Sequence, residues 1–97
     1  MTNKEQIIYD AAEKQWGKEA QLVQAVEELS ELIKAICKYL NRGGEIKYIF
    51  EETADVEIMC AQIRHMFTDK GSDFDIDTYK NFKLDRLAVK LSLLDIK

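Results

Sequence analysis

Five acidic residues lie in two groups whose spacing could hold a metal ion. Glu27, Glu28 and Glu31 form the first group, and Glu52 and Asp55 follow after twenty intervening residues. Each residue of a helix advances by ~100°, so Glu28 and Glu31 are separated by only ~60° and can face one target. Glu52 interrupts an apolar pattern, where a carboxylate destabilises the fold unless it is paired. The two groups are therefore candidates for one shared site.

The donor atoms of such a site indicate its chemistry. If the two helices pack antiparallel, as a short Gly-Gly connection favours, the carboxylates of Glu28, Glu31, Glu52 and Asp55 converge and repel one another. A hard divalent cation relieves this repulsion, and a site without histidine or cysteine favours Mg²⁺ or Mn²⁺ over Zn²⁺. Because Mg²⁺ held by few carboxylates keeps positions open for phosphate oxygens, these residues predict phosphoryl or pyrophosphoryl transfer.

The same residues resemble the signature of a known enzyme family. The string EELSE at 27–31 and the string ETAD at 52–55 resemble the EExxE…ExxD motifs of MazG-like, all-α nucleoside triphosphate pyrophosphohydrolases. The lead-in at 16–21, Leu32 and the segment 56–59 are also similar to that family. The resemblance covers about residues 16–67 closely and the last helix more loosely.

The resemblance implies an activity, a metal and an assembly. The activity is hydrolysis of a nucleoside triphosphate between its α and β phosphates, and members act as dimers or dimers of dimers. Carried onto this sequence, the Mg²⁺ ligands are Glu28, Glu31, Glu52 and Asp55. Glu27 or Glu31 then positions or deprotonates the attacking water.

Basic and aromatic residues complete the predicted site. Lys80, Lys83 and Arg86 recur every three residues in the last helix, and a basic helix edge faces the triphosphate in related proteins. We expect Lys83 and Arg86 to bind phosphate and to stabilise charge on the leaving pyrophosphate. Trp16 either packs beneath the site or stacks on the substrate's base.

Glycines divide the chain into four segments with helical periodicity. Gly17, the Gly43-Gly44 pair and Gly71 each follow such a segment, and the chain contains no proline. The expected helices run from a capping box at Thr2 to about residue 16, over 18–41, over 46–67, and from just after the acidic run that ends at Asp77 through Leu94. We therefore predict one all-α domain over residues 1–97, with a four-helix, bundle-like fold.

Apolar residues at alternating spacings of three and four predict which helix faces are buried. The helix at 18–41 has one such stripe, named here the leucine-isoleucine stripe, and a second seam that contains small residues. The stripe consists of Leu22, Val26, Leu29, Ile33, Ile36 and Leu40. The second seam consists of Ala25, Leu32, Ala35 and Tyr39. The following helix has its own set, Ile49, Val56, Met59, Ile63 and Met66. We expect these faces to pack, which includes burial on more than one side of the helix at 18–41.

Composition bounds the function further. The chain has 97 residues and a formal net charge of −4, which argues against binding nucleic acid. We expect no membrane span and no secretory signal. A domain of this size buries a thin core, so a homodimer or homotetramer is expected. Cys37 and Cys60 are predicted to be small buried residues of a reduced, cytoplasmic protein.

Two other functions stay open. One is a related enzyme, a phosphoribosyl-ATP or dUTP/dCTP pyrophosphohydrolase, which would share the metal ligands and differ in its base pocket. The other is a non-catalytic acidic helical module that binds a basic partner. Glu52 favours an enzyme over the non-catalytic module, because an interaction surface has no need for a carboxylate inside an apolar seam.

Overall fold

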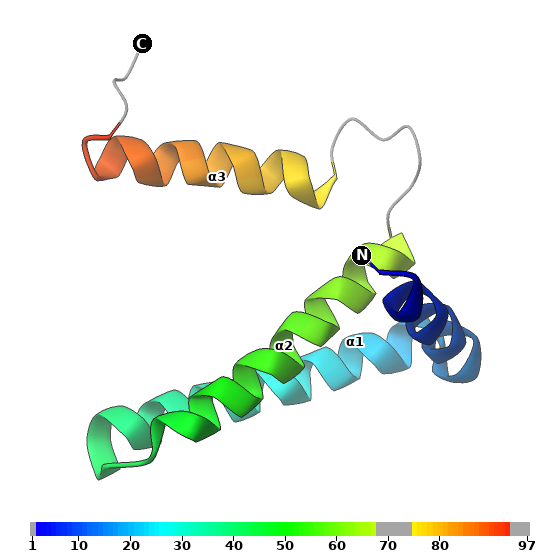
Figure 1. The fold of residues 1–97 in the computed structure, drawn as a ribbon, viewed down its shortest axis with the longest axis horizontal. Helices are drawn as coiled ribbons and strands as arrows, with labels where there is room; N and C mark the ends of the chain where they lie inside the picture. Colours follow the sequence, from blue (N-terminus) through cyan, green and yellow to red (C-terminus); the bar gives the residue numbers. More distant parts are fainter. Residues whose placement is uncertain (1, 68–74, 94–97) are drawn as a thin grey trace. The chain divides into compact units, whose positions relative to one another are not determined.

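A computed structural model describes residues 2–67 and 75–93 of the chain, and every described element is helical. Helix α1 spans Asn3–Arg42, α2 spans Ile46–Phe67 and α3 spans Ile76–Lys90 (Figure 1). The α1–α2 pair forms one compact unit, and α3 belongs to a second. The all-α prediction is confirmed, whereas the four-helix bundle stays a prediction. None of the described helices is both long and apolar enough to cross a membrane.

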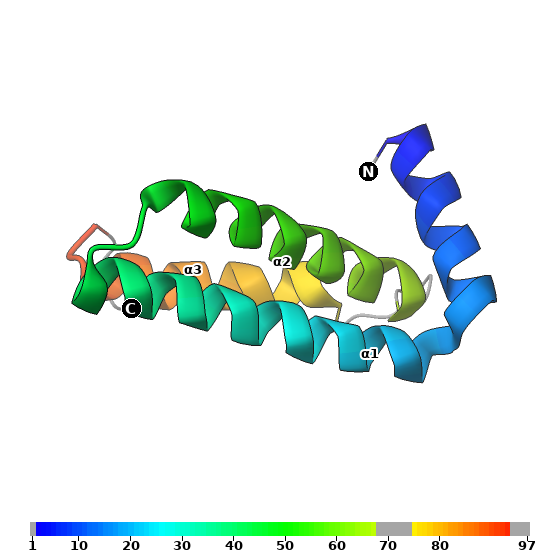
Figure 2. The same ribbon diagram turned by 90° about the horizontal axis from the view of Figure 1, so that it is seen from below.

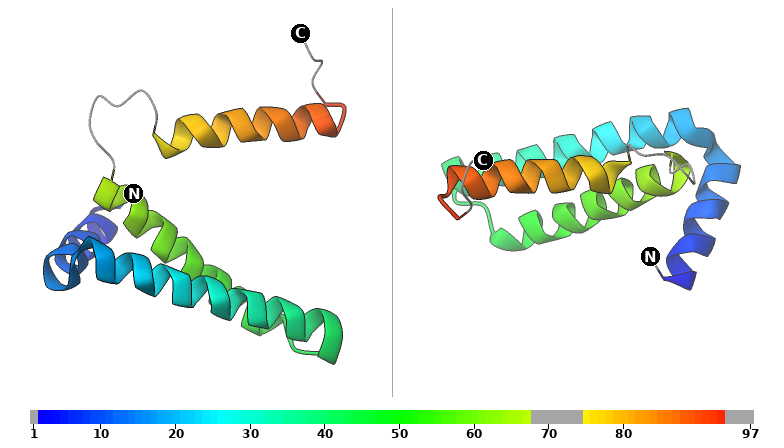
Figure 3. Two further views of the ribbon diagram at one scale, coloured as in Figure 1. Left: turned by 180° about the vertical axis from the view of Figure 1, so that it is seen from behind. Right: turned by 90° about the horizontal axis from the view of Figure 1, so that it is seen from above.

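Helix α1 consists of two straight segments joined at Gly17. This residue has φ 83° and ψ 166°, a conformation outside the helical region that glycine adopts without steric cost. The axis changes direction there, as Figures 2 and 3 show. Thr2 caps the first segment, because its Oγ1 accepts a hydrogen bond from the backbone N–H of Glu5 at 3.1 Å and the Glu5 carboxylate reaches back. The predicted break at residue 17 and the predicted capping box are both confirmed.

A glycine turn reverses the chain between α1 and α2. Gly43 has a left-handed φ of 67°, and the Gly44 N–H donates to the Lys38 carbonyl oxygen at 3.0 Å. This pattern is a common way to satisfy the last carbonyl groups of a helix. A side chain at Gly44 would lie 3.1 Å from Lys38 atoms, so the turn is tight. The second segment of α1 therefore runs back alongside α2 in an antiparallel pair (Figure 2).

The α1–α2 contact uses the seam of small residues. Ala25 and Ala35 of α1 and Met59 and Met66 of α2 are buried, together with Tyr9 and Ala12 from the first segment. The leucine-isoleucine stripe was expected to pack, but its six residues are 39–71% exposed. One partner helix covers one face only, and the alanines allow the closest approach of the two backbones. Within the α1–α2 unit, the second apolar face of α1 is consequently exposed.

The first segment of α1 is attached to the end of α2 by polar contacts. The His65 Nε2 atom lies 2.6 Å from an Asp10 carboxylate oxygen. The ring centroids of Tyr9 and His65 are 6.1 Å apart. The Tyr9 hydroxyl donates to the Glu5 carboxylate at 3.5 Å. The contacts of Asp10 and Tyr9 with His65 hold the segment before the Gly17 kink against α2.

Two sequence expectations differ from the structure. Cys37 and Cys60 are free thiols as expected, but both are exposed. Each lies one or two residues from a buried position, so helical rotation of ~100° per residue turns it out of the seam. The last helix begins with Asp75, whose carboxylate accepts from the Thr78 N–H at 2.9 Å, and it ends at Lys90. The predicted extension is wrong for residues 91–93, which form a turn with Ser92 at φ 61°, and Leu94 itself lies outside the described residues.

Candidate metal centre

Three carboxylates from two helices form the candidate metal centre. Glu28 comes from α1, and Glu52 and Asp55 come from α2. One oxygen of each carboxylate lies within 4.8 Å of one oxygen of each of the others. Glu28 and Glu52 are half-buried, whereas Asp55 is exposed. The antiparallel pairing predicted from the Gly-Gly connection therefore brings together three of the four expected ligands.

A glutamine orients the α1 member of the group. The Gln24 Nε2 atom donates to Glu28 Oε1 at 2.9 Å, one helical turn before it. The bond restrains the Glu28 carboxylate within one turn of α1. We had not identified Gln24 from the sequence, although its spacing of four residues from Glu28 is a usable signal.

The electrostatics of the group disfavour its fully ionised form. Desolvation raises the pKa of Glu52, and the negative charges of Asp55, Glu28, Glu31 and Glu51 raise it further. A cation placed among the carboxylates would oppose both effects, because it stabilises ionised oxygen atoms. The arrangement therefore has the property expected of a cation site.

The other two acidic residues of the motif lie outside this group. Glu31, predicted to be a ligand, has its Oε1 atom 3.6 Å from Lys34 Nζ. That lysine lies three residues further along α1, where the side chains of a helix meet, so it competes for the carboxylate. Glu27 is exposed, and its backbone carbonyl accepts a hydrogen bond from Ser30 Oγ at 2.7 Å.

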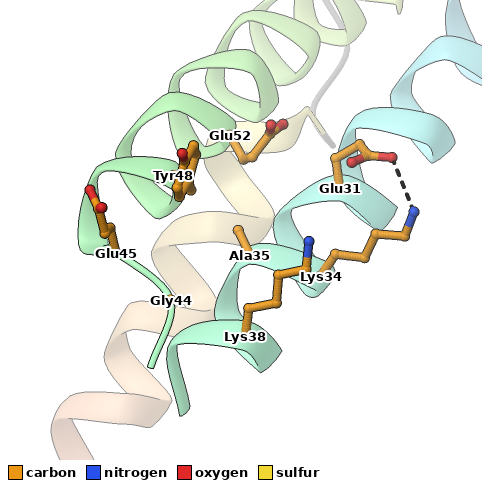
Figure 4. A pocket seen from close by; sticks show the side chains of 8 residues that line it. All are labelled: Glu31, Lys34, Ala35, Lys38, Gly44, Glu45, Tyr48 and Glu52. Carbon is orange, nitrogen blue, oxygen red and sulfur yellow. Dashed lines mark ion pairs between the residues drawn. The ribbon is translucent and has the colours of Figure 1, made fainter. Parts of the chain in front are cut away.

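A pocket of about 430 Å³ adjoins the group toward the glycine turn. Figure 4 shows Lys34 and Lys38 on its α1 wall and Tyr48 and Glu52 on its α2 wall. The remaining lining residues are Glu31, Ala35, Gly44 and Glu45. Both lysines line the same pocket as Glu52 of the group, and the Lys34 ammonium group is turned toward Glu31 (Figure 4). Sequence reasoning missed these lysines, although their positions 34 and 38 continue the face of Glu31.

The predicted substrate-binding residues are divided between the two units. Lys83 and Arg86 are exposed on α3, so their contact with phosphate stays a prediction. Trp16 is 65% exposed and lines a second pocket of the α1–α2 unit, together with Gln21, Gln24 and Met59.

Searches against models of protein families, curated proteins and solved structures found no match. The resemblance described above therefore rests on the two acidic motifs and their neighbours alone.

Proposed function

We propose that this chain is a Mg²⁺-dependent nucleoside triphosphate pyrophosphohydrolase. It would hydrolyse a ribo- or deoxyribonucleoside triphosphate to the nucleoside monophosphate and pyrophosphate. The observation that carries the proposal is the meeting of Glu28, Glu52 and Asp55, from both acidic motifs, within 4.8 Å. The carboxylates of this group come from two helices that are distant in the sequence, and not from one solvated helix face.

The donor set fits Mg²⁺ or Mn²⁺. Octahedral Mg²⁺ binds oxygen at 2.0–2.1 Å, so its ligand oxygens are about 3–4 Å apart. The oxygens of the group lie within 4.8 Å, and small side-chain rotations would bring them to this spacing. Such an ion would supply charge neutralisation of the phosphates and a more acidic bound water. Three protein ligands would leave further coordination positions for phosphate oxygens and for water.

The chain's own residues supply the remaining roles. Lys34 and Lys38 would bind phosphate oxygens in the adjoining pocket and hold the leaving pyrophosphate, with Lys83 and Arg86 as further candidates. Glu31 lines that pocket and would accept the proton of the attacking water. The water oxygen bonds to the α-phosphorus, and the bond from that phosphorus to the oxygen bridging the β-phosphate breaks. Glu27 is the alternative base.

We also propose a homodimer or homotetramer in a reducing compartment such as the cytoplasm. The leucine-isoleucine stripe supports the assembly, because six neighbouring large side chains are 39–71% exposed. Exposed apolar patches of this kind are typical of protein interfaces. The two exposed thiols support the compartment.

The test is product analysis from a panel of nucleoside triphosphates with Mg²⁺. We expect pyrophosphate and monophosphate in equal amounts, lost in Glu52→Ala and retained in Glu57→Ala, an exposed acid of the same helix. Orthophosphate and a diphosphate would contradict the proposed bond cleavage. If neither the panel nor phosphoribosyl-ATP is hydrolysed, the non-catalytic acidic module becomes the favoured function.

A further inference from the structure

Gln21 is buried and has no hydrogen-bond partner among the residues that the structure describes. Its side chain belongs to the start of the second α1 segment and is only 3% exposed. Within residues 2–67 and 75–93, neither its amide oxygen nor its amide nitrogen makes a hydrogen bond, and both atoms are covered. A buried amide without partners destabilises a fold, so an unpaired glutamine in this position calls for an explanation.

Gln21 lines a pocket whose side chains suit a flat, polar ring. The pocket has a volume of about 350 Å³ and is lined by Trp16, Ala20, Gln21, Gln24, Met59 and Gln62. One aromatic face, one thioether and three amides combine stacking surface with hydrogen-bond donors and acceptors. This volume lies within the range of small-molecule pockets.

The pocket is adjacent to the metal centre. Gln24 lines the pocket and also donates to the Glu28 carboxylate at 2.9 Å. The lysine pocket borders the same centre through Glu52. A bound nucleotide could therefore place its phosphates at the carboxylates and lysines while its base reaches toward Trp16.

We propose that this pocket binds the nucleobase of the substrate, with the Gln21 amide as the residue that reads the base edge. An amide offers a donor beside an acceptor and pairs with a ring edge that presents the complementary pair, as glutamine does with adenine. The Trp16 ring stacks on the base. Because the amide is covered, a lining side chain rotates to admit the ring, and Gln62 is long enough to do so. The inference rests on the proposed nucleotide substrate but not on its hydrolysis.

The test uses the fluorescence of Trp16, the single tryptophan of the chain. The full chain is titrated with Mg²⁺ and each of several nucleoside triphosphates, and in parallel with inorganic tripolyphosphate, which has no base. We expect saturable quenching by at least one nucleotide and little quenching by tripolyphosphate. A mixed-sequence single-stranded oligonucleotide provides the same rings from another source, and we expect weaker quenching by it because the chain is acidic.

Gln21→Met tests the amide, and Gln6→Met, an exposed glutamine of the first segment, is its control. We expect the Gln21→Met protein to lose preference among bases by tenfold or more, to bind tripolyphosphate as the unaltered protein does, and to melt at an equal or higher temperature. Unchanged base preference, or no nucleotide quenching while tripolyphosphate binds, would overturn the inference. Quenching that depends on Gln21 without pyrophosphate release would support this pocket while contradicting the proposed reaction.

Discussion

Binding of Mg²⁺ to the three-carboxylate group should raise the melting temperature of this protein, and Glu52→Gln should abolish the effect. Glu52 is half-buried and its pKa is raised by desolvation and by neighbouring acids. A raised pKa in the folded state means that the ionised side chain lowers stability above the ordinary glutamate pKa. Replacing it with neutral glutamine should therefore leave the metal-free protein as stable as before, or more stable.

The size of the effect follows from ligand linkage and chain length. A metal concentration one hundred times the dissociation constant adds about 2.7 kcal/mol to the free energy of unfolding. Unfolding entropy is about 2.1 cal/mol/K per residue, so 97 residues give about 0.2 kcal/mol/K. The melting temperature should then rise by about 13 °C, since 2.7 divided by 0.2 is close to that value.

Thermal unfolding followed by circular dichroism, with increasing Mg²⁺ and at several pH values, measures the shift. Protons compete with the metal for Glu52, so the shift should be full above its raised pKa and disappear as the pH falls through it. This loss should begin at a higher pH than for an ordinary glutamate. Glu57→Gln should keep the shift. An unaltered protein that does not respond to saturating Mg²⁺, or a Glu52→Gln protein that responds equally, would refute the metal centre.

Three further substitutions test the fold and the assembly. Gly17→Ala should lower the free energy of unfolding by about 1–3 kcal/mol in chemical denaturation, because alanine is strained at φ 83°. No atom lies within 4 Å of the added methyl group, so the cost comes from the backbone. An unchanged denaturation midpoint would contradict the kink at this residue. Met59→Ala should cost about 2–4 kcal/mol because this side chain is only 6% exposed, whereas the half-exposed Ile58→Ala should cost far less. Ile33→Asp should dissociate the proposed homo-oligomer in analytical ultracentrifugation, with little loss of helix content. Val23→Asp, a substitution outside the stripe, should leave the oligomer intact. Equal dissociation by both substitutions would argue against the stripe as the interface.

Much of the helical framework could be predicted because its signals are local. The capping box at Thr2, the break at Gly17 and the reversal at Gly43 each depend on a few neighbouring residues. The acid group was also predictable, since helical spacing and antiparallel pairing suffice to bring Glu28 and Glu52 together.

Burial of both apolar faces of α1 was predicted, whereas only the face with Ala25 and Ala35 is buried within the α1–α2 unit. Counting large side chains favours the leucine-isoleucine stripe, but close approach of two backbones favours the face with Ala25 and Ala35. The pairing of Glu31 with Lys34 escaped prediction for a related reason, because two helical neighbours compete for one carboxylate. Gln21 lies four residues before Ala25 and so continues the seam of small residues, but its polar side chain gave no reason to expect burial.

The alanine seam would also bear on how wide a cation the proposed centre accepts. Ala25 and Ala35 are small buried residues of α1, and in the same helix pair the Glu28 carboxylate lies within 4.8 Å of those of Glu52 and Asp55. Calcium binds oxygen at 2.3–2.6 Å and prefers six to eight ligands, whereas magnesium needs a tighter shell. Selectivity between the two ions would then depend on the methyl side chains of Ala25 and Ala35, which are not ligands of the ion. A bulkier residue in the seam would shift the preference toward the larger ion.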